Sequence, residues 1–169
     1  MIMTKIKIAL VLFSIAAMPG ALLAAQPTVH VEPPNLHGPR QLQDQTATAV
    51  VRDYVESWQS LAAALRQNRP DLLDQDFVGT AKDKLTDTIH QQAALGLHTR
   101  YQDQAHKIKI VFYSPDGLSV QLVDDVEYEE RVVDQQKVLA TQHTHARYTV
   151  VMTPAETRWR VRIFQAEPE

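Results

Sequence analysis

The sequence predicts an α+β domain in which N-terminal helices pack on a curved, four-stranded antiparallel meander with the shape of a cone. Two observations lead to this prediction. Apolar residues recur at helical spacing in residues 46–95, whereas after residue 101 they alternate with polar residues. The predicted helices therefore all precede the predicted strands, an order that is typical of α+β folds.

The N-terminus indicates the compartment. Lys5 and Lys7 precede the apolar run IALVLFSIAAM, and small residues lead to a cleavage point after Ala25. This is the layout of a secretory signal peptide, so residues 1–25 are predicted to be removed and the protein to be secreted or periplasmic. The alternative is a retained membrane anchor, because the apolar stretch is nearly long enough to cross a bilayer.

Composition excludes several classes of partner. The formal net charge is −3, and removal of the signal peptide would take two lysines with it. A mildly acidic chain without a basic cluster predicts no nucleic-acid partner, and no membrane contact once the signal peptide is cleaved. The sequence contains no cysteine, so the core alone must hold the domain together. No cofactor is expected.

Residues 26–45 form the predicted connection to the folded domain, which is assigned to residues 46–169. The segment contains four prolines and a glycine. Proline lacks a backbone N–H and favours an extended path, so no regular element is expected here. The segment is predicted to be a tether, or an arm that lies on the domain.

Two long helices are predicted next. The first ends before Pro70, because a proline disfavours helical geometry in the residue before it. The second runs from Thr80 to Gly96, a residue suited to the left-handed end of a helix. The first covers residues 46–67, where apolar residues recur every three or four positions: Val51, Val55, Trp58, Ala62 and Leu65.

Four strands are predicted after residue 101. Turns at residues 114–117 and 134–136 separate the first three, and residues 154–157 precede the last. One face of this meander is apolar and must be covered by the helices. Its inward-facing residues include Ile108, Ile110, Phe112, Leu118, Val120, Leu122, Val126, Tyr128, Tyr148, Val150, Trp159, Val161 and Ile163.

The stretch QHTHARY raises the question of a metal site. If Tyr148 faces the core, alternation places His143 and His145 on the outer face of the sheet. There they would lie in a ladder of opposite charges, between the acidic row of Asp125, Glu127 and Glu129 and the arginine row of Arg158, Arg160 and Arg162. The alternative is a zinc or copper site formed by His143, His145 and Glu127, but no further pair of ligands completes it.

Polar residues also interrupt the inward-facing series. Because a buried carboxylate must be paired or solvated, Asp124 suggests a pocket closed by the first helix, although it could simply pair with a neighbour. The candidate catalytic residues are Tyr54, Asp124 and His106. The predicted ligand pocket comprises Tyr54, Trp58, Asp124, Tyr128, Gln142 and Thr144.

The order of elements, together with the stretches DYVESW, FVGTA and RWRVRIF, resembles the nuclear transport factor 2-like superfamily, including its SnoaL-like and ketosteroid-isomerase-like branches. The resemblance spans residues 46–164 and implies a pocket within a cone, not a particular chemistry. In ketosteroid isomerases a tyrosine at the position of Tyr54 helps to stabilise an enolate oxygen. The strand that carries their catalytic base is not evident in DLLDQDFVGTAKDK.

Three functions are compatible with these features. The missing base favours a non-catalytic binding module that engages a small apolar or mixed-polarity ligand, or a protein partner, with a homodimer through the sheet as a further option. The first alternative is a cofactor-free isomerase, cyclase or dehydratase with Asp124 or His106 as base and Tyr54 as oxyanion donor. The second is a membrane-anchored assembly protein of the same fold.

Overall fold

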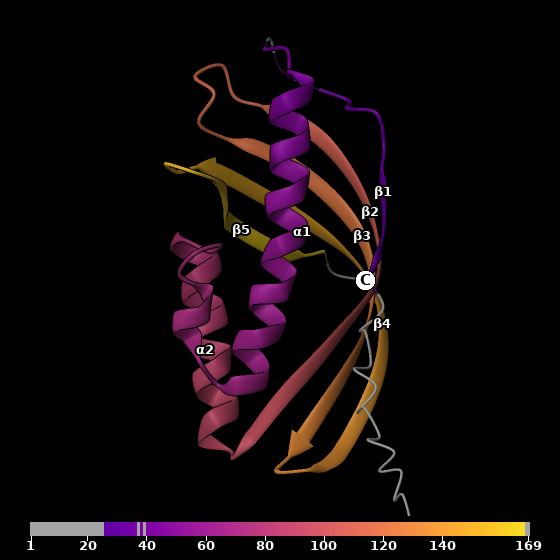
Figure 1. Ribbon diagram of the computed structural model, residues 1–169, viewed down its shortest axis with the longest axis vertical. Coiled ribbons are helices and arrows are strands. Elements are labelled where there is room, and N and C mark those ends of the chain that lie inside the picture. Colours follow the sequence, from indigo (N-terminus) through magenta and orange to yellow (C-terminus); the bar gives the residue numbers. More distant parts are fainter. Residues whose placement is uncertain (1–25, 37, 39, 168–169) are drawn as a thin grey trace, which may run out of the picture.

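A computed structural model describes residues 26–36, 38 and 40–167, so the predicted signal peptide lies outside the described residues. Two long helices cover one face of a curved five-stranded sheet with the order β1-β2-β3-β4-β5 (Figure 1). The predicted α+β class is confirmed. In chain order the elements are β1 (Thr28–Val31), α1 (Asp44–Gln67), the 3-10 helix η1 (Pro70–Leu73), α2 (Gly79–Ala94), β2 (Leu97–Tyr113), β3 (Val120–Asp134), β4 (Lys137–Pro154) and β5 (Trp159–Ala166).

The sheet has one strand more than the sequence predicted. The additional strand, β1, lies within the segment expected to contain no regular element, and it pairs in parallel with residues 105–108 of β2. The prolines do not prevent this pairing because they flank the strand instead of interrupting it. An edge strand also needs hydrogen bonds on only one of its sides.

Strands β2 to β5 form the predicted antiparallel meander. The β3–β4 hairpin turns at Gln135, whose φ of 52° lies in the left-handed region. This turn sets the register, which pairs Leu122 with Val150 on the inner face and Asp125 with Arg147 on the outer face. Because side chains alternate along both strands, the same faces continue from Val120 to Val132. Between Val132 and Val133 the pairing shifts, with Leu139 as an extra residue on β4.

The last strand departs from the predicted alternation. The pairing with β4 shifts between Val151 and Met152, where Arg162 is an extra residue on β5. A bulge of this kind reverses the side-chain alternation beyond it. Phe164 therefore packs against the core, whereas Ile163, which was expected to face inward, is 39% exposed. Leu118 was also placed wrongly, since it precedes β3 and is exposed.

The core lies between α1 and the concave face of the sheet. Trp58 is at its centre, with its ring centroid 5.3–5.7 Å from those of four neighbours: His106, Tyr128, Tyr148 and Phe164. The buried stripe of α1 contains Val50, Tyr54, Trp58, Leu61 and Leu65. Val51 and Val55, expected at its centre, lie at its margin and are half-buried.

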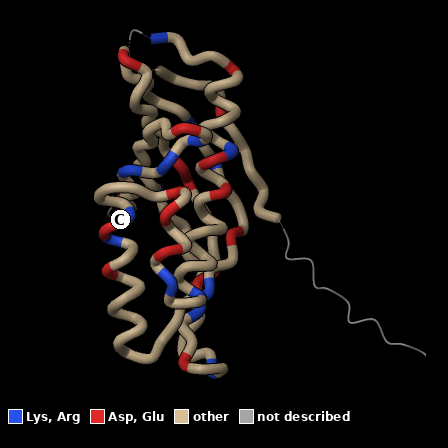
Figure 2. The backbone as a smooth tube through the Cα atoms, turned by 60° about the vertical axis from the view of Figure 1, so that its left-hand side comes forward, with Lys and Arg blue, Asp and Glu red and all other residues tan. Residues whose placement is uncertain are grey.

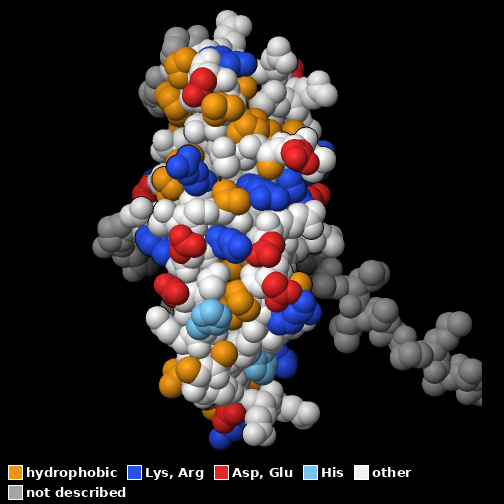
Figure 3. Space-filling view, turned by 90° about the vertical axis from the view of Figure 1, so that its left-hand side faces the viewer, with side chains coloured by type: hydrophobic (Ala, Val, Ile, Leu, Met, Phe, Trp, Pro, Cys, Tyr) orange, Lys and Arg blue, Asp and Glu red, His pale blue; other side chains and the backbone are white. Residues whose placement is uncertain are grey.

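Charges of both signs alternate along the backbone, with no long stretch of one sign (Figure 2). On the side that carries α2 and β5, acidic and basic side chains gather across the middle of the molecule (Figure 3). This distribution is that of an ordinary solvated surface. Within the described residues, no helix has the length and apolarity needed to span a membrane.

Candidate functional site

The three candidate catalytic residues meet in one buried network. The Tyr54 hydroxyl donates a hydrogen bond of 2.8 Å to Oδ2 of Asp124, and Nδ1 of His106 lies 2.7 Å from the same oxygen. The backbone N–H of Lys107 donates to the other oxygen, Oδ1, at 3.1 Å. Both oxygens of the carboxylate are therefore engaged by groups that α1 and β2 hold in place.

The electrostatics of the network fix its protonation state. Burial lowers the pKa of His106, but hydrogen bonds and charge interactions with Asp103 and Asp124 outweigh it and raise that pKa to about 9. Burial, together with the charge of Asp124, raises the pKa of Tyr54 well above its usual value. At neutral pH the pair is therefore an imidazolium and a neutral phenol, both of which donate hydrogen bonds to the carboxylate.

This network is closed to solvent. Tyr54 and Asp124 are 0% exposed, and His106 and Trp58 are 2% exposed. Trp58 packs its ring edge against His106, with 5.4 Å between the ring centroids. A catalytic acid or base must come within hydrogen-bond reach of its substrate. In this arrangement a substrate cannot reach the side chains of the network, because they are buried. The hydrogen bonds of the network join α1, β2 and β3.

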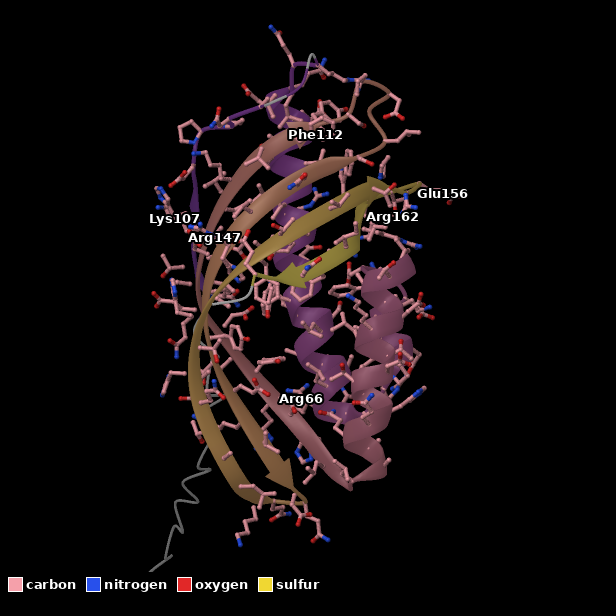
Figure 4. All side chains as sticks on the ribbon, turned by 180° about the vertical axis from the view of Figure 1, so that it is seen from behind. Arg66, Lys107, Phe112, Arg147, Glu156 and Arg162 are labelled. Atoms are coloured by element: carbon pink, nitrogen blue, oxygen red, sulfur yellow. The ribbon has the colours of Figure 1, made fainter. Side chains whose placement is uncertain are left out.

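The other predicted pocket residues lie further along the inner face of the hairpin. Tyr128 is buried against Trp58, Thr144 is half-buried opposite Tyr128, and Gln142 is exposed. Around Tyr128 the inner face is aromatic: ring centroids are 5.0 Å apart for Tyr101 and Tyr128, and 4.5 Å apart for Tyr148 and Phe164. Side chains occupy much of the space between sheet and helices (Figure 4).

The outer face carries part of the predicted ladder of opposite charges. The acidic row of β3 lies opposite the histidine-arginine row of β4, but the expected arginine row does not continue it, because β5 pairs only with residues 148–154 of β4. Arg147 donates two hydrogen bonds to Asp125, at 2.7 and 3.0 Å. His143 Nε2 lies 3.3 Å from Glu129 Oε2, and His145 lies opposite Glu127 in the strand register. In Figure 4 the labelled Lys107 and Arg147 point away from the helices on this face.

These side chains do not form a ready metal site. Among the described residues, no group of three or more histidine, aspartate or glutamate side chains is arranged to hold a metal ion. His143 and His145 are both exposed, and each faces an acidic residue on the neighbouring strand. The ladder accounts for QHTHARY without a metal, because opposite charges on adjacent strands stabilise the pairing.

An apolar groove with a volume of about 700 Å³ lies between β1 and α1. The groove was not predicted from the sequence, because one of its walls is the unexpected strand β1. The alternation of Val29 and Val31 was the available signal. The groove's apolar walls are Val29, Val31, Pro34, Ala47, Val51, Val55 and Ile110, and its charged rim is Glu32, Asp44, Arg52 and Glu56.

A second buried charge cluster was also missed. Arg158, expected on the outer face of the sheet, is largely buried and reaches Asp76 at 3.0 Å and Glu56 at 2.6 Å. Asp53, also buried, accepts a hydrogen bond from the backbone N–H of Trp159 at 2.8 Å. The difference arises because Arg158 precedes β5 and does not follow its alternation. The cluster fastens the start of β5 to α1.

Comparison with solved structures identifies the fold. The intermembrane space region of the chloroplast protein ARC6 matches with a TM-score of 0.61 and 17% identity, over 77% of this chain and 100% of that one. A candidate scytalone dehydratase from Novosphingobium aromaticivorans matches with a TM-score of 0.50 and 11% identity, over 75% and 89%. The chain therefore shares its overall fold with these two structures.

A nuclear transport factor 2-like superfamily protein from Salmonella enterica also matches, with a TM-score of 0.46 and 13% identity over 73% of this chain and 94% of that one. No family model and no curated protein matches the sequence. Proteins of one fold carry out many unrelated functions, so this likeness concerns the fold and leaves the function to the site.

Proposed function

We propose that this protein is an extracytoplasmic, non-catalytic binding module whose binding site is the groove between β1 and α1. The proposal rests on the difference in accessibility between the interior of the domain and the groove. The acid–histidine–tyrosine network in the interior is 0–2% exposed, whereas the groove is open and has mainly apolar walls. Binding sites for small molecules are typically concave and mostly apolar, with a few polar groups at defined positions.

The state of the network argues against catalysis. Asp124 accepts hydrogen bonds from Tyr54, His106 and Lys107 and is fully buried, so a substrate could reach its carboxylate only if the surrounding side chains moved. His106, with a pKa raised to about 9, is already protonated at neutral pH and cannot act as a base there. The network is better suited to a structural role, because buried charges that are paired hold neighbouring elements in one register.

The volume and the charged rim of the groove limit which ligands it can bind. Its volume of about 700 Å³ lies within the usual range of roughly 300–1,000 Å³ for small-molecule sites. Three carboxylates and one guanidinium surround it, those of Glu32, Asp44, Glu56 and Arg52. Most of these charges are already paired, Glu32 with Lys107 and Lys109 and Glu56 with Arg158, so the rim favours a neutral ligand over a charged one. We therefore assign the site to a neutral apolar molecule, or to an apolar side chain of a protein partner.

The N-terminal sequence supports the proposed compartment. The signal-peptide pattern supports export, and the fold likeness to an intermembrane space region is compatible with it. Intact-mass analysis of the protein isolated from its native cell would test this proposal. A chain that begins at Gln26 would support release after cleavage, whereas a chain that retains residues 1–25 would support the anchored assembly protein.

The binding site can be tested with a neutral apolar dye, N-phenyl-1-naphthylamine, whose fluorescence rises in apolar surroundings. Val51→Glu places a charge on the groove wall, and burial of an unpaired charge beside the dye should weaken binding at least about tenfold. Gln59→Glu is the matched control, because it adds the same charge to an exposed position of α1 outside the groove. Equal dye affinity in both variants and in the wild type would contradict the assignment.

One observation favours the enzyme alternative. Nε2 of His106 is buried and has no hydrogen-bond partner, with Oδ2 of Asp103 3.6 Å away. A substrate could use this nitrogen only if Trp58 moved aside, because Trp58 covers the imidazole. A ligand of such an enzyme would perturb the NMR signals of His106 and Trp58 and leave those of the groove residues unchanged.

A further inference from the structure

The strand β1 has one side without a partner. It pairs only with β2, and all four of its residues are exposed. It forms one margin of the sheet (Figure 1). The N–H of Glu32, immediately after β1, donates to the carbonyl of Ile108 in β2 at 2.8 Å. Because successive residues of a strand direct their backbone groups to opposite sides, Val31 and Val29 direct theirs away from β2.

Two prolines bound this unpaired edge. Pro27 lies two residues before Val29, and Pro33 lies two residues after Val31. Both prolines are therefore at positions whose backbone groups face away from β2. Proline has no N–H, so it cannot donate to a further strand. Prolines at a sheet edge also restrict uncontrolled strand addition. The free edge therefore offers N–H donors at only Val29 and Val31, which fixes the length and the register of any strand that joins it.

This edge is self-complementary. Residues 27–33 read PTVHVEP, in which the prolines and valines are arranged symmetrically about His30. A twofold interface brings the same surface of two subunits together, so it requires a self-complementary pattern. We propose that β1 pairs with β1 of a second copy of this chain, antiparallel, with His30 at the twofold axis.

In this arrangement Val29 lies opposite Val31 of the second copy, and Val31 opposite its Val29. Each such pair exchanges two backbone hydrogen bonds, which satisfies the valine N–H and carbonyl groups that face away from β2. The prolines then lie opposite prolines, where neither strand requires an N–H donor. A strand of any other register would place a valine N–H opposite the wrong partner or leave it unpaired.

The pairing also covers exposed apolar surface. Val29 is 38% exposed and Val31 is 47% exposed, and both side chains line the groove beside α1. The valines of the second copy would lie next to them on the same face of the extended sheet and would extend the apolar wall of the groove. The dimer stands on the edge pattern alone, so it does not depend on the proposed ligand.

Disulfide trapping tests the register. The chain contains no cysteine, so a single introduced cysteine can only form a disulfide between two copies. In the proposed register His30 lies opposite itself in a non-hydrogen-bonded pair, with Cα atoms about 4.5 Å apart, which permits a disulfide. Thr28 is the matched control, since it is exposed on the same face but lies about 13 Å from its counterpart.

His30→Cys should therefore give at least about ten times more cross-linked dimer than Thr28→Cys under mild oxidation with copper–phenanthroline. This ratio follows from the difference in separation, because a disulfide cannot span more than about 7 Å between Cα atoms. Equal cross-linking of both variants would refute the register. Failure of His30→Cys to cross-link would refute the dimer.

A second pair of variants tests the edge without a cysteine. Val29→Pro removes an N–H that has no role inside the chain, so the protein should still fold but sediment as a monomer. Val29→Thr keeps both the N–H and the branched side chain and should remain a dimer. Sedimentation of Val29→Pro as the wild type would overturn the proposal. Because Val29 also lines the groove, dye binding is measured on the Val51→Glu and Gln59→Glu variants and oligomeric state on the His30 and Thr28 variants, so either proposal can fail alone.

Discussion

The buried imidazolium should make stability depend on pH in the alkaline range. The pKa of His106 is raised from 6.5 to about 9, because Asp103 and Asp124 outweigh the effect of burial. The folded state then binds the proton more tightly than the unfolded state. The resulting stabilisation is fully present below pH 6.5 and is lost as the pH rises through 9. The difference between the two pKa values corresponds to about 3 kcal/mol in the free energy of unfolding.

Urea unfolding of the wild type at pH 6 and pH 9.5 measures this loss, and His106→Gln removes the titrating group. The variant should lose about 3 kcal/mol less than the wild type between the two pH values, since other groups titrate equally in both. Tyr54→Phe is the control, because it removes one hydrogen bond to Asp124 but leaves the ion pair in place. If His106→Gln shows the same pH dependence as the wild type, His106 does not titrate as argued.

Three further substitutions test the packing and the charge clusters. Trp58→Ala should lower the free energy of unfolding by about 3–5 kcal/mol, because it empties the centre of the core; a wild-type melting temperature would contradict the packing. Arg158→Met should cost about 3 kcal/mol in urea unfolding by leaving the buried carboxylate of Asp76 unpaired, unlike an ordinary surface substitution. Replacement of both His143 and His145 by alanine should leave folding and zinc content unchanged, and stoichiometric zinc lost in the double variant would show otherwise.

The helices and the β3–β4 register could be predicted because their signals are local. The side-chain period changes once, and the hairpin turn then determines which residues face each other. Asp124 was predicted to face the first helix for this reason, and Tyr54 indeed reaches it. What alternation could not predict is that the carboxylate is fully enclosed. Its enclosure depends on how Trp58 fills the space beside His106, which is a property of packing.

The errors have physical causes of two kinds. At β1, the prolines flank the short alternation of Val29 and Val31 and do not interrupt it, so a high proline content did not exclude an edge strand. At β5, the bulge at Arg162 has no distinct sequence signal, so a regular alternation was extended past it. The position of Arg158 was also predicted wrongly from regular alternation. Arg158 precedes β5, which begins at Trp159, and its side chain pairs with Asp76.

The central claim is that ligands bind in the groove and not in the interior. NMR chemical-shift mapping with N-phenyl-1-naphthylamine tests it most directly, because the two sites involve different residues. Shifts are expected at Val29, Val31 and Val51, which line the groove, whereas the side-chain signals of His106 and Trp58 should be unchanged. Shifts concentrated at His106 and Trp58, with the groove residues unaffected, would contradict the account and place the binding site beside the buried network.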